Sequence, residues 1–279
     1  MMSRQTFIKL CSLLLAGTLL PVDAKTPKSA SMPALFFGHG SPMNIIEDNS
    51  FTQMLKKTAL SIPTPEAILV ISAHWVNFET SLSTVRETET IYDFGGFPSE
   101  LYEVSYPAKG SHILADRLSI PVTSRGLDHG AWSILTHMYP KADIPVMQLS
   151  INRNMSLKEH YALGQRLSSL QEHGVLIIGS GGVTHNLGYF DTQHIDSTPE
   201  TSAKAFDTFV KETIENKEYE ALLTPEQSSG IPLRDVHPTL EHYIPLLYIA
   251  GIAALGEKNT FIHEGFQNKA FSMRAWKVG

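Results

Sequence analysis

Residues 34–44 read ALFFGHGSPMN, an apolar run that ends at a histidine, His39, held between two glycines. Residues 67–75 read AILVISAHW and repeat the pattern, because His74 follows a second apolar run. Continuous apolar runs of this kind are typical of strands that are buried on both faces of a sheet. The two segments therefore predict buried strands that each deliver a histidine as they leave the core.

Further apolar runs at residues 81–85, 145–151 and 175–180 predict three more strands. Segments with helical signals lie between and after these runs, at residues 50–60, 156–173 and 198–217. The alternation of strands and helices predicts a single α/β domain, with a central, mostly parallel sheet flanked by helices.

The predicted helices carry recognisable start signals. Ser156 and Glu159 form a capping box at the start of the second helix, in which each side chain binds the other residue's free backbone N–H. Thr198 and Pro199 are suited to the N-cap and first position of the third helix. Residues 86–110 form a long loop region with several aromatic residues, and such loops are often functional.

Histidines recur where predicted strands and helices begin or end. His185 follows the run and glycine turn VLIIGSGGVT, and His237 precedes Pro238, which is expected to begin a helix. Ligands bind beyond the carboxyl ends of the strands in open α/β sheets. A single histidine there is more often structural, but several together favour a metal site. Imidazole suits zinc, iron and copper, and a site without cysteine tends to be catalytic because it keeps open positions.

One further histidine has the setting of a proton carrier. His129 lies in GLDHGAW, residues 126–132, beside Asp128 and ahead of a predicted helix. A histidine with a neighbouring carboxylate can exchange protons near neutral pH. Aspartate and glycine are also common in ordinary turns, so the tripeptide DHG alone is a weak signal.

The first 24 residues have the order of an export signal. Arg4 and Lys9 precede an apolar run at residues 11–22, and the segment VDA ends in a small residue, Ala24, before Lys25. The run is shorter than the roughly 20 apolar residues of a membrane span. We therefore predict a cleaved signal at residues 1–24 and a periplasmic protein; the alternative is a signal retained as an anchor. Residues 25–32 are then a short linker, and residues 33–279 are the catalytic domain.

Composition excludes several classes of protein. The only cysteine, Cys11, lies in the predicted signal, so the mature chain has no disulfide and no thiolate for chemistry. The net charge of −6, without a block of basic residues, disfavours nucleic-acid binding. No later segment reaches the length of a membrane span, so no stable span is expected after signal cleavage. The sequence leaves the oligomeric state open.

Five motifs together, GHGSPMN, SAHW, LDHGAW, GSGGVTHNL and HPTLEHYIPLLY, resemble the class III (LigB-type) extradiol ring-cleavage dioxygenases. The resemblance is greatest to the 4,5-DOPA dioxygenase branch, and the motifs follow the order of that family. It implies a metal-dependent enzyme that cleaves a DOPA-like catechol with O2 to a muconic semialdehyde. Iron (Fe2+) is the implied functional metal, and zinc (Zn2+) is the alternative bound metal because some relatives hold it.

The resemblance also implies roles for individual residues. His39, His74 and His237 match positions associated with the metal, and His185 matches a histidine that is a ligand in some members and an acid or base in others. His129 matches a histidine that helps to position substrate and oxygen. Glu241 is the alternative to His237, since related enzymes use two histidines and a carboxylate.

Two other functions remain open at this point. A zinc-dependent hydrolase would use the same histidines to generate a metal hydroxide. A non-enzymatic metal-binding protein on the same scaffold is the other alternative, although such a protein would not need the proton carriers His129 and His185.

Overall fold

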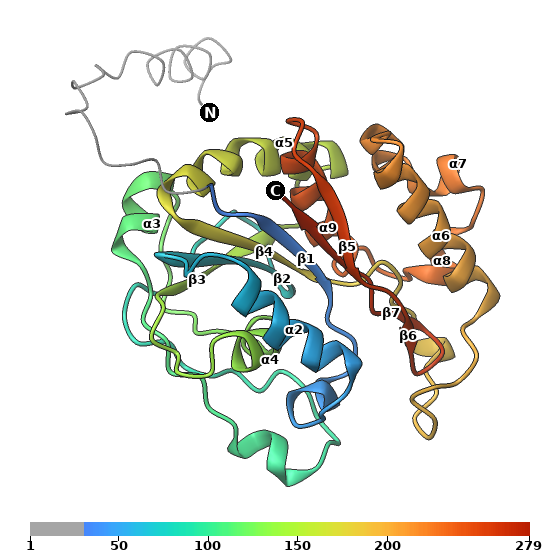
Figure 1. Ribbon diagram of the computed structural model, residues 1–279, viewed down its shortest axis with the longest axis horizontal. Coiled ribbons are helices and arrows are strands. Elements are labelled where there is room, and N and C mark those ends of the chain that lie inside the picture. The colour runs from blue at the N-terminus through green and yellow to red at the C-terminus, as the bar shows by residue number, and fades with distance from the viewer. Residues whose placement is uncertain (1–30) are drawn as a thin grey trace.

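The computed structural model describes residues 31–279 and is built around a six-stranded sheet in the order β3-β2-β4-β1-β8-β5 (Figure 1). Strands β3, β2, β4 and β1 are parallel, β8 is antiparallel to β1, and β5 is antiparallel to β8. The strands are β1 (Ala34–Gly38), β2 (Ala67–Asn77), β3 (Val146–Asn152), β4 (Val175–Gly181), β5 (Asn259–His263) and β8 (Ala275–Val278). The predicted mostly parallel sheet is confirmed. The predicted export signal and most of the linker at 25–32 lie outside the described residues.

Helices cover both faces of the sheet and bury alternate residues of each strand (Figure 1). In β1, Ala34 and Phe36 belong to one core, while Leu35 and Phe37 belong to the other. The first core contains residues of α5 (Leu157–Leu167), α6 (Thr201–Glu215) and α9 (Ile244–Ala253), and the second contains residues of α2 (Ser50–Ser61) and α4 (His129–Met138). Burial on both faces explains why the strands are continuously apolar.

Shorter elements complete the chain. They are the helices α3 (His112–Leu118), α7 (Pro225–Ser229) and α8 (Leu233–Val236), the strands β6 (Phe266–Gln267) and β7 (Phe271–Ser272), and 3-10 turns at Pro42–Ile45, Ser99–Glu103, Ser168–His173, Leu187–Tyr189 and Tyr219–Leu223. Within residues 31–279, no helix has the length and apolarity needed to cross a membrane.

One predicted strand, at residues 81–85, does not form. The segment runs beside β3, and two backbone hydrogen bonds join them, from Ser83 N–H to the Gln148 carbonyl and from Ser150 N–H to the Ser81 carbonyl. Serine hydroxyls take the place of the other two backbone acceptors: Ser81 N–H donates to Ser150 Oγ, and Gln148 N–H donates to Ser83 Oγ. Only isolated bridges at Leu82 remain. Side-chain hydrogen bonds of this kind compete with a regular ladder, which explains the error.

The helix predictions succeed where a cap is present. The capping box of Ser156 and Glu159 is present at the start of α5, which ends at Leu167 and continues as a 3-10 turn. The third predicted helix corresponds to α6, which begins at Thr201 rather than beside Pro199. The preceding chain stays outside the helix because Glu200 N–H donates to the Lys269 carbonyl.

A buried histidine in α5 links the stability of the fold to pH. The His160 side chain is fully buried, and its Nδ1 lies 2.9 Å from the Tyr248 hydroxyl of α9. Burial lowers the pKa of His160 to about 4, whereas an exposed histidine has a pKa of about 6.5. Between these values the unfolded chain binds a proton that the folded chain does not. The stabilisation is complete above pH 6.5 and is lost as the pH falls towards 4.

We expect His160→Gln to show a smaller loss of stability on acidification than the wild type. The difference between the two proteins, on going from pH 7 to pH 5, should be about 2 kcal/mol in the free energy of unfolding. Chemical denaturation at both pH values measures it, and the other buried histidines cancel in the comparison. Identical pH dependence in the two proteins would contradict the prediction.

Candidate metal centre and active site

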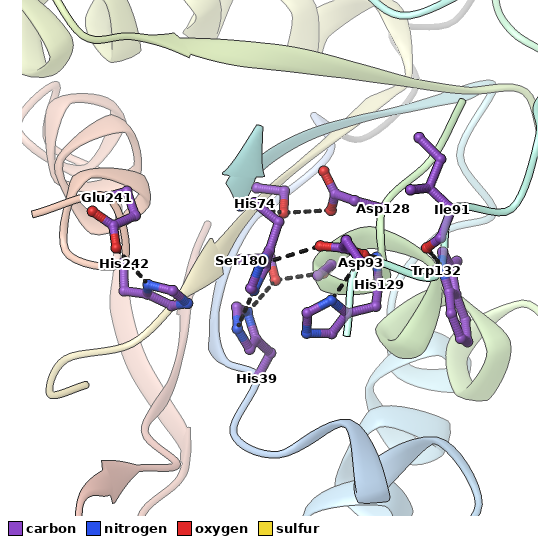
Figure 2. Close-up of polar contacts among 12 residues, drawn as sticks. His39, His74, Ile91, Asp93, Asp128, His129, Trp132, Ser180, Glu241 and His242 are labelled. Carbon is purple, nitrogen blue, oxygen red and sulfur yellow. Dashed lines mark hydrogen bonds and ion pairs between the residues drawn. The ribbon is translucent and has the colours of Figure 1, made fainter. Parts of the chain in front are cut away.

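Three histidine rings from distant parts of the chain meet beyond the carboxyl ends of the parallel strands (Figure 2). His39 follows β1, His74 lies near the end of β2, and His242 lies in the turn before α9. One ring nitrogen from each lies within 4.8 Å of the others. The ring centroids are 4.9–5.4 Å apart. This is an arrangement in which three imidazoles can share one cation.

The hydrogen bonds of His39 fix its tautomer. Its Nδ1 lies 2.9 Å from the Ser180 hydroxyl of β4, which pairs with β1. Ser180 uses its single hydroxyl proton to donate to the Gly130 carbonyl. The hydroxyl must therefore accept a proton from His39 Nδ1, and His39 Nε2 presents a lone pair.

A carboxylate fixes the tautomer of His74 in the same way. Asp93 Oδ2 lies 3.2 Å from His74 Nδ1, which favours the proton on that nitrogen. His74 Nε2 then also presents a lone pair, and it lies 3.2 Å from His39 Nε2. Two lone pairs that face each other at this distance require a cation between them. The donor set thus fits a metal ion.

His242 completes the set and has both ring nitrogens uncommitted. Its side chain is buried, yet neither nitrogen has a hydrogen-bond partner among the described residues. Buried polar atoms are normally paired, so this ring is suited to bind a metal ion. Glycines at and just after the end of β4 allow the approach: Gly182 N–H donates to the His242 carbonyl, and a Cβ at Gly181, the last residue of β4, would lie 2.2 Å from that carbonyl oxygen.

His237, predicted as a ligand, lies outside this cluster, and the prediction is corrected to His242. Its Nε2 donates to the Val183 carbonyl at 2.7 Å, and its ring packs near Phe206 and Tyr243. The ligand role of His237 comes from the family resemblance, and the sequence also predicts a helix that starts at Pro238. Instead α8 ends before His237 and α9 begins at Ile244, so the intervening turn delivers the later histidine to the site.

Glu241, the predicted alternative ligand, lines the cavity but is outside the group of close ligand atoms. Its Oε1 accepts a hydrogen bond from the Thr239 hydroxyl at 2.7 Å and lies 3.5 Å from His242 Nδ1. It is therefore placed beside a ligand rather than among the ligands.

His185 stacks against the cluster formed by His39, His74 and His242. Its ring is parallel to that of His242, with centroids 3.5 Å apart and an angle of 7° between the planes. Phe271 covers the other face at 4.8 Å. The ring lines the cavity between a ligand and an apolar wall, so it is placed to contact a bound molecule.

His129 lies on the opposite side of the cluster, at the start of α4. Its ring centroid is 4.0 Å from that of His74. The preceding residue, Asp128, is fully buried and accepts hydrogen bonds from Ser72 Oγ and Gln148 Nε2, which anchors the turn. The next residue must be glycine, because a Cβ at Gly130 would lie 2.4 Å from Ser72 Oγ and 2.9 Å from the His74 ring.

Asp93 connects the two sides of the site, and the sequence reasoning missed it. Its Oδ1 lies 3.0 Å from His129 Nδ1 and accepts the backbone N–H of His129 at 2.9 Å, while Oδ2 contacts His74 (Figure 2). It lies in the long loop that the sequence singled out for its aromatic residues. The position of Asp93 between two aromatic residues, Tyr92 and Phe94, is the feature of the sequence that could have pointed to it.

Burial keeps the clustered histidines neutral. It lowers the pKa of His39 and His242 well below 6.5, that of His74 to about 3 and that of His185 to about 4. Burial alone would raise the pKa of Asp93, but hydrogen bonding and charge from His129 outweigh it and lower that pKa to about 2. Neutral imidazoles are the form that binds metal.

The cavity above the histidines has a volume of about 460 Å³. Its walls are largely apolar and come from Phe94 and Phe97 in the long loop and from Leu187, Phe190 and Phe271. Tyr92, from the same loop, instead donates its hydroxyl proton to the Val104 carbonyl and packs against Trp132. Apolar walls over a polar floor suit a planar molecule with two adjacent polar groups.

Comparisons with known proteins agree with this chemistry. Residues 33–273 match the model of the family described as the catalytic LigB subunit of aromatic ring-opening dioxygenase. The chain is 41% identical over 263 residues to 4,5-DOPA dioxygenase extradiol of Escherichia coli K12, which covers 90% of this chain and 96% of that protein. It is 37% identical over 263 residues to the protein of the same name from Beta vulgaris, covering 87% of this chain and 94% of that one.

A solved structure shows the same fold. The crystal structure of an uncharacterised protein from Escherichia coli K12 matches with a TM-score of 0.76 and 37% sequence identity, covering 89% of this chain and all of the other. The predicted fold and the predicted extradiol dioxygenase chemistry are confirmed by these relatives. The chain therefore belongs to the LigB family of aromatic ring-opening dioxygenases.

Proposed function

We propose that this protein is an iron (Fe2+)-dependent extradiol dioxygenase that cleaves a DOPA-like catechol with O2 to a muconic semialdehyde. The observation that carries the proposal is the pair of facing lone pairs on His39 and His74, joined by the uncommitted ring of His242, beneath an apolar cavity. The names of the relatives from Escherichia coli and Beta vulgaris support a DOPA-like substrate.

The metal would be held by His39, His74 and His242. When bound, it would lower the pKa of the catechol hydroxyls through its charge and would supply the redox chemistry that O2 requires. Three neutral nitrogen ligands without a thiolate suit iron and also zinc. We propose iron as the working metal, because ring cleavage with O2 needs a redox-active ion and zinc is not redox-active.

The surrounding residues of the chain handle protons and orientation. A catechol that is to be cleaved must lose a proton, and the imidazoles of His185 and His129 lie beside the cluster, against His242 and His74 respectively, where either can take part in that proton transfer. Asp93 holds His129 and His74 in fixed orientations, so the proton carrier and the ligand keep their relative positions. Phe94, Phe97 and Phe271 supply apolar surface in the cavity lining against which an aromatic ring can pack.

We also propose a periplasmic location, with residues 1–24 as a cleaved signal. The basic residues, the short apolar run and the small residue Ala24 before Lys25 support it.

The function is tested by anaerobic reconstitution of the purified protein with Fe2+, followed by addition of a catechol and O2. We expect oxygen uptake together with a yellow product that absorbs as a ring-opened semialdehyde, with DOPA among the substrates cleaved. A sample reconstituted with Zn2+ should bind metal but not consume oxygen. Protein shown to contain Fe2+ that turns over no catechol would overturn the proposed function.

A further inference from the structure

Apart from its histidines, the charged residues that line the cavity are all acidic. Among the described residues, its lining includes two carboxylates, Asp93 and Glu241, and no lysine or arginine. Arg125 approaches the His74 carbonyl, but it is not part of the lining, and its guanidinium is directed to the buried Asp128. A catechol substituent that carries only a negative charge therefore finds no lysine or arginine in the described wall of the cavity.

The two carboxylates differ in how far they are engaged. Both oxygens of Asp93 contact the imidazoles of His74 and His129. Glu241 uses only Oε1, which accepts the Thr239 hydroxyl proton and lies near His242 Nδ1. Within residues 31–279 its Oε2 has no hydrogen bond or ion pair, and the side chain, which is part of the cavity lining, is 31% exposed. Glu241 thus lines the cavity and keeps one carboxylate oxygen without a protein partner among the described residues.

We propose that Glu241 determines substrate specificity by binding the ammonium group of the catechol's side chain. The natural substrates would then be catechols with a short amine-bearing substituent, including zwitterionic amino acids, and not catechols whose only charge is a carboxylate. The reasoning rests on the proposed function, because it assumes that the two catechol hydroxyls face His39, His74 and His242. The substituent must then extend along the remaining lining, where Glu241 stands next to His242.

A second role for Glu241 predicts a different result. Since Oε1 lies 3.5 Å from His242 Nδ1, the carboxylate also has the position of a group that orients a ligand. Loss of orientation would slow all catechols by the same factor. Loss of ammonium recognition would slow only the cationic ones. The ratio of rates between substrates separates the two roles, because the metal and the ring are common to all of them.

The experiment compares three catechols on Fe2+-reconstituted protein: dopamine, which is cationic, 4-methylcatechol, which is neutral, and 3,4-dihydroxyphenylacetate, which is anionic. In Glu241→Gln, which keeps the acceptor for Thr239, kcat/KM for dopamine should fall about tenfold, the effect of one ion pair in a partly closed site. The value for 4-methylcatechol should stay within about twofold, and that for the anion should rise. Glu241→Asp should keep the preference for dopamine, and Glu172→Gln, an exposed change outside the cavity, should alter none of the three values.

Binding supplies a readout that does not depend on turnover. The Kd of dopamine for the Zn2+-loaded protein, measured by calorimetry without O2, should rise about tenfold in Glu241→Gln, while the Kd of 4-methylcatechol should not change. Equal losses for all three catechols, or no loss for dopamine, would overturn the proposal. If no catechol is cleaved but the binding preference is present, the proposed function fails and the assignment of Glu241 stands.

Discussion

His242→Gln is expected to lose its metal, while the same substitution at His237 leaves the metal bound. His242 presents two uncommitted ring nitrogens at a cluster where His39 and His74 already face each other. Without its ring, one of three imidazole ligands is gone, and glutamine is a poor replacement. The metal affinity should fall by at least about a hundredfold, since even groups that only orient ligands contribute 10–100-fold.

His237→Gln is the matched control because it changes the same side chain five residues away. Its ring donates to the Val183 carbonyl, a role that a glutamine amide can also fill. Metal content after dialysis, measured by elemental analysis with circular dichroism as the check on folding, distinguishes the two variants. Loss of metal from His237→Gln together with full retention in His242→Gln would restore the ligand set that the sequence predicted.

The contrast between these two histidines shows how far the sequence alone could go. His39 and His74 were located because each follows a continuous apolar run, and parallel strands bring their carboxyl ends to one edge of a sheet. No such regularity covers residues 238–243, where an irregular turn separates α8 from α9. Both His237 and His242 lie close to that turn, and only its path decides which one reaches the cluster.

Asp93 illustrates a second limit of sequence reasoning. Hydrophobic periodicity predicts strands and helices, but a long loop takes its path from contacts with the rest of the fold. The loop is fixed by distant partners, since Ile91 N–H donates to the Leu127 carbonyl and Tyr106 N–H donates to Thr90 Oγ1. These contacts bring Asp93 to His129, which is 36 residues further along the chain. Nothing in the local sequence encodes that pairing.

Asp93→Asn is expected to lower both the affinity for the metal and the turnover rate, although Asp93 is not itself in the group formed by His39, His74 and His242. The carboxylate accepts from the backbone N–H of His129 and contacts the Nδ1 atoms of His129 and His74. An asparagine has one acceptor oxygen in place of two and carries no charge. Because the pKa of Asp93 is lowered to about 2 by His129 against the effect of burial, the carboxylate is ionised at any working pH. The substitution therefore removes a full charge.

The metal affinity of Asp93→Asn should fall by about 10–100-fold, the usual effect of removing a carboxylate that orients a ligating histidine. His129→Ala provides the comparison, since it removes the proton carrier and leaves the contact of Asp93 with His74. That variant should keep its metal and lose most of its rate, by about a hundredfold for a general acid or base. Metal titration followed by turnover at saturating Fe2+ separates the two effects. Should Asp93→Asn bind metal as tightly as the wild type, Asp93 would serve His129 alone, and the fixed tautomer of His74 would need another cause.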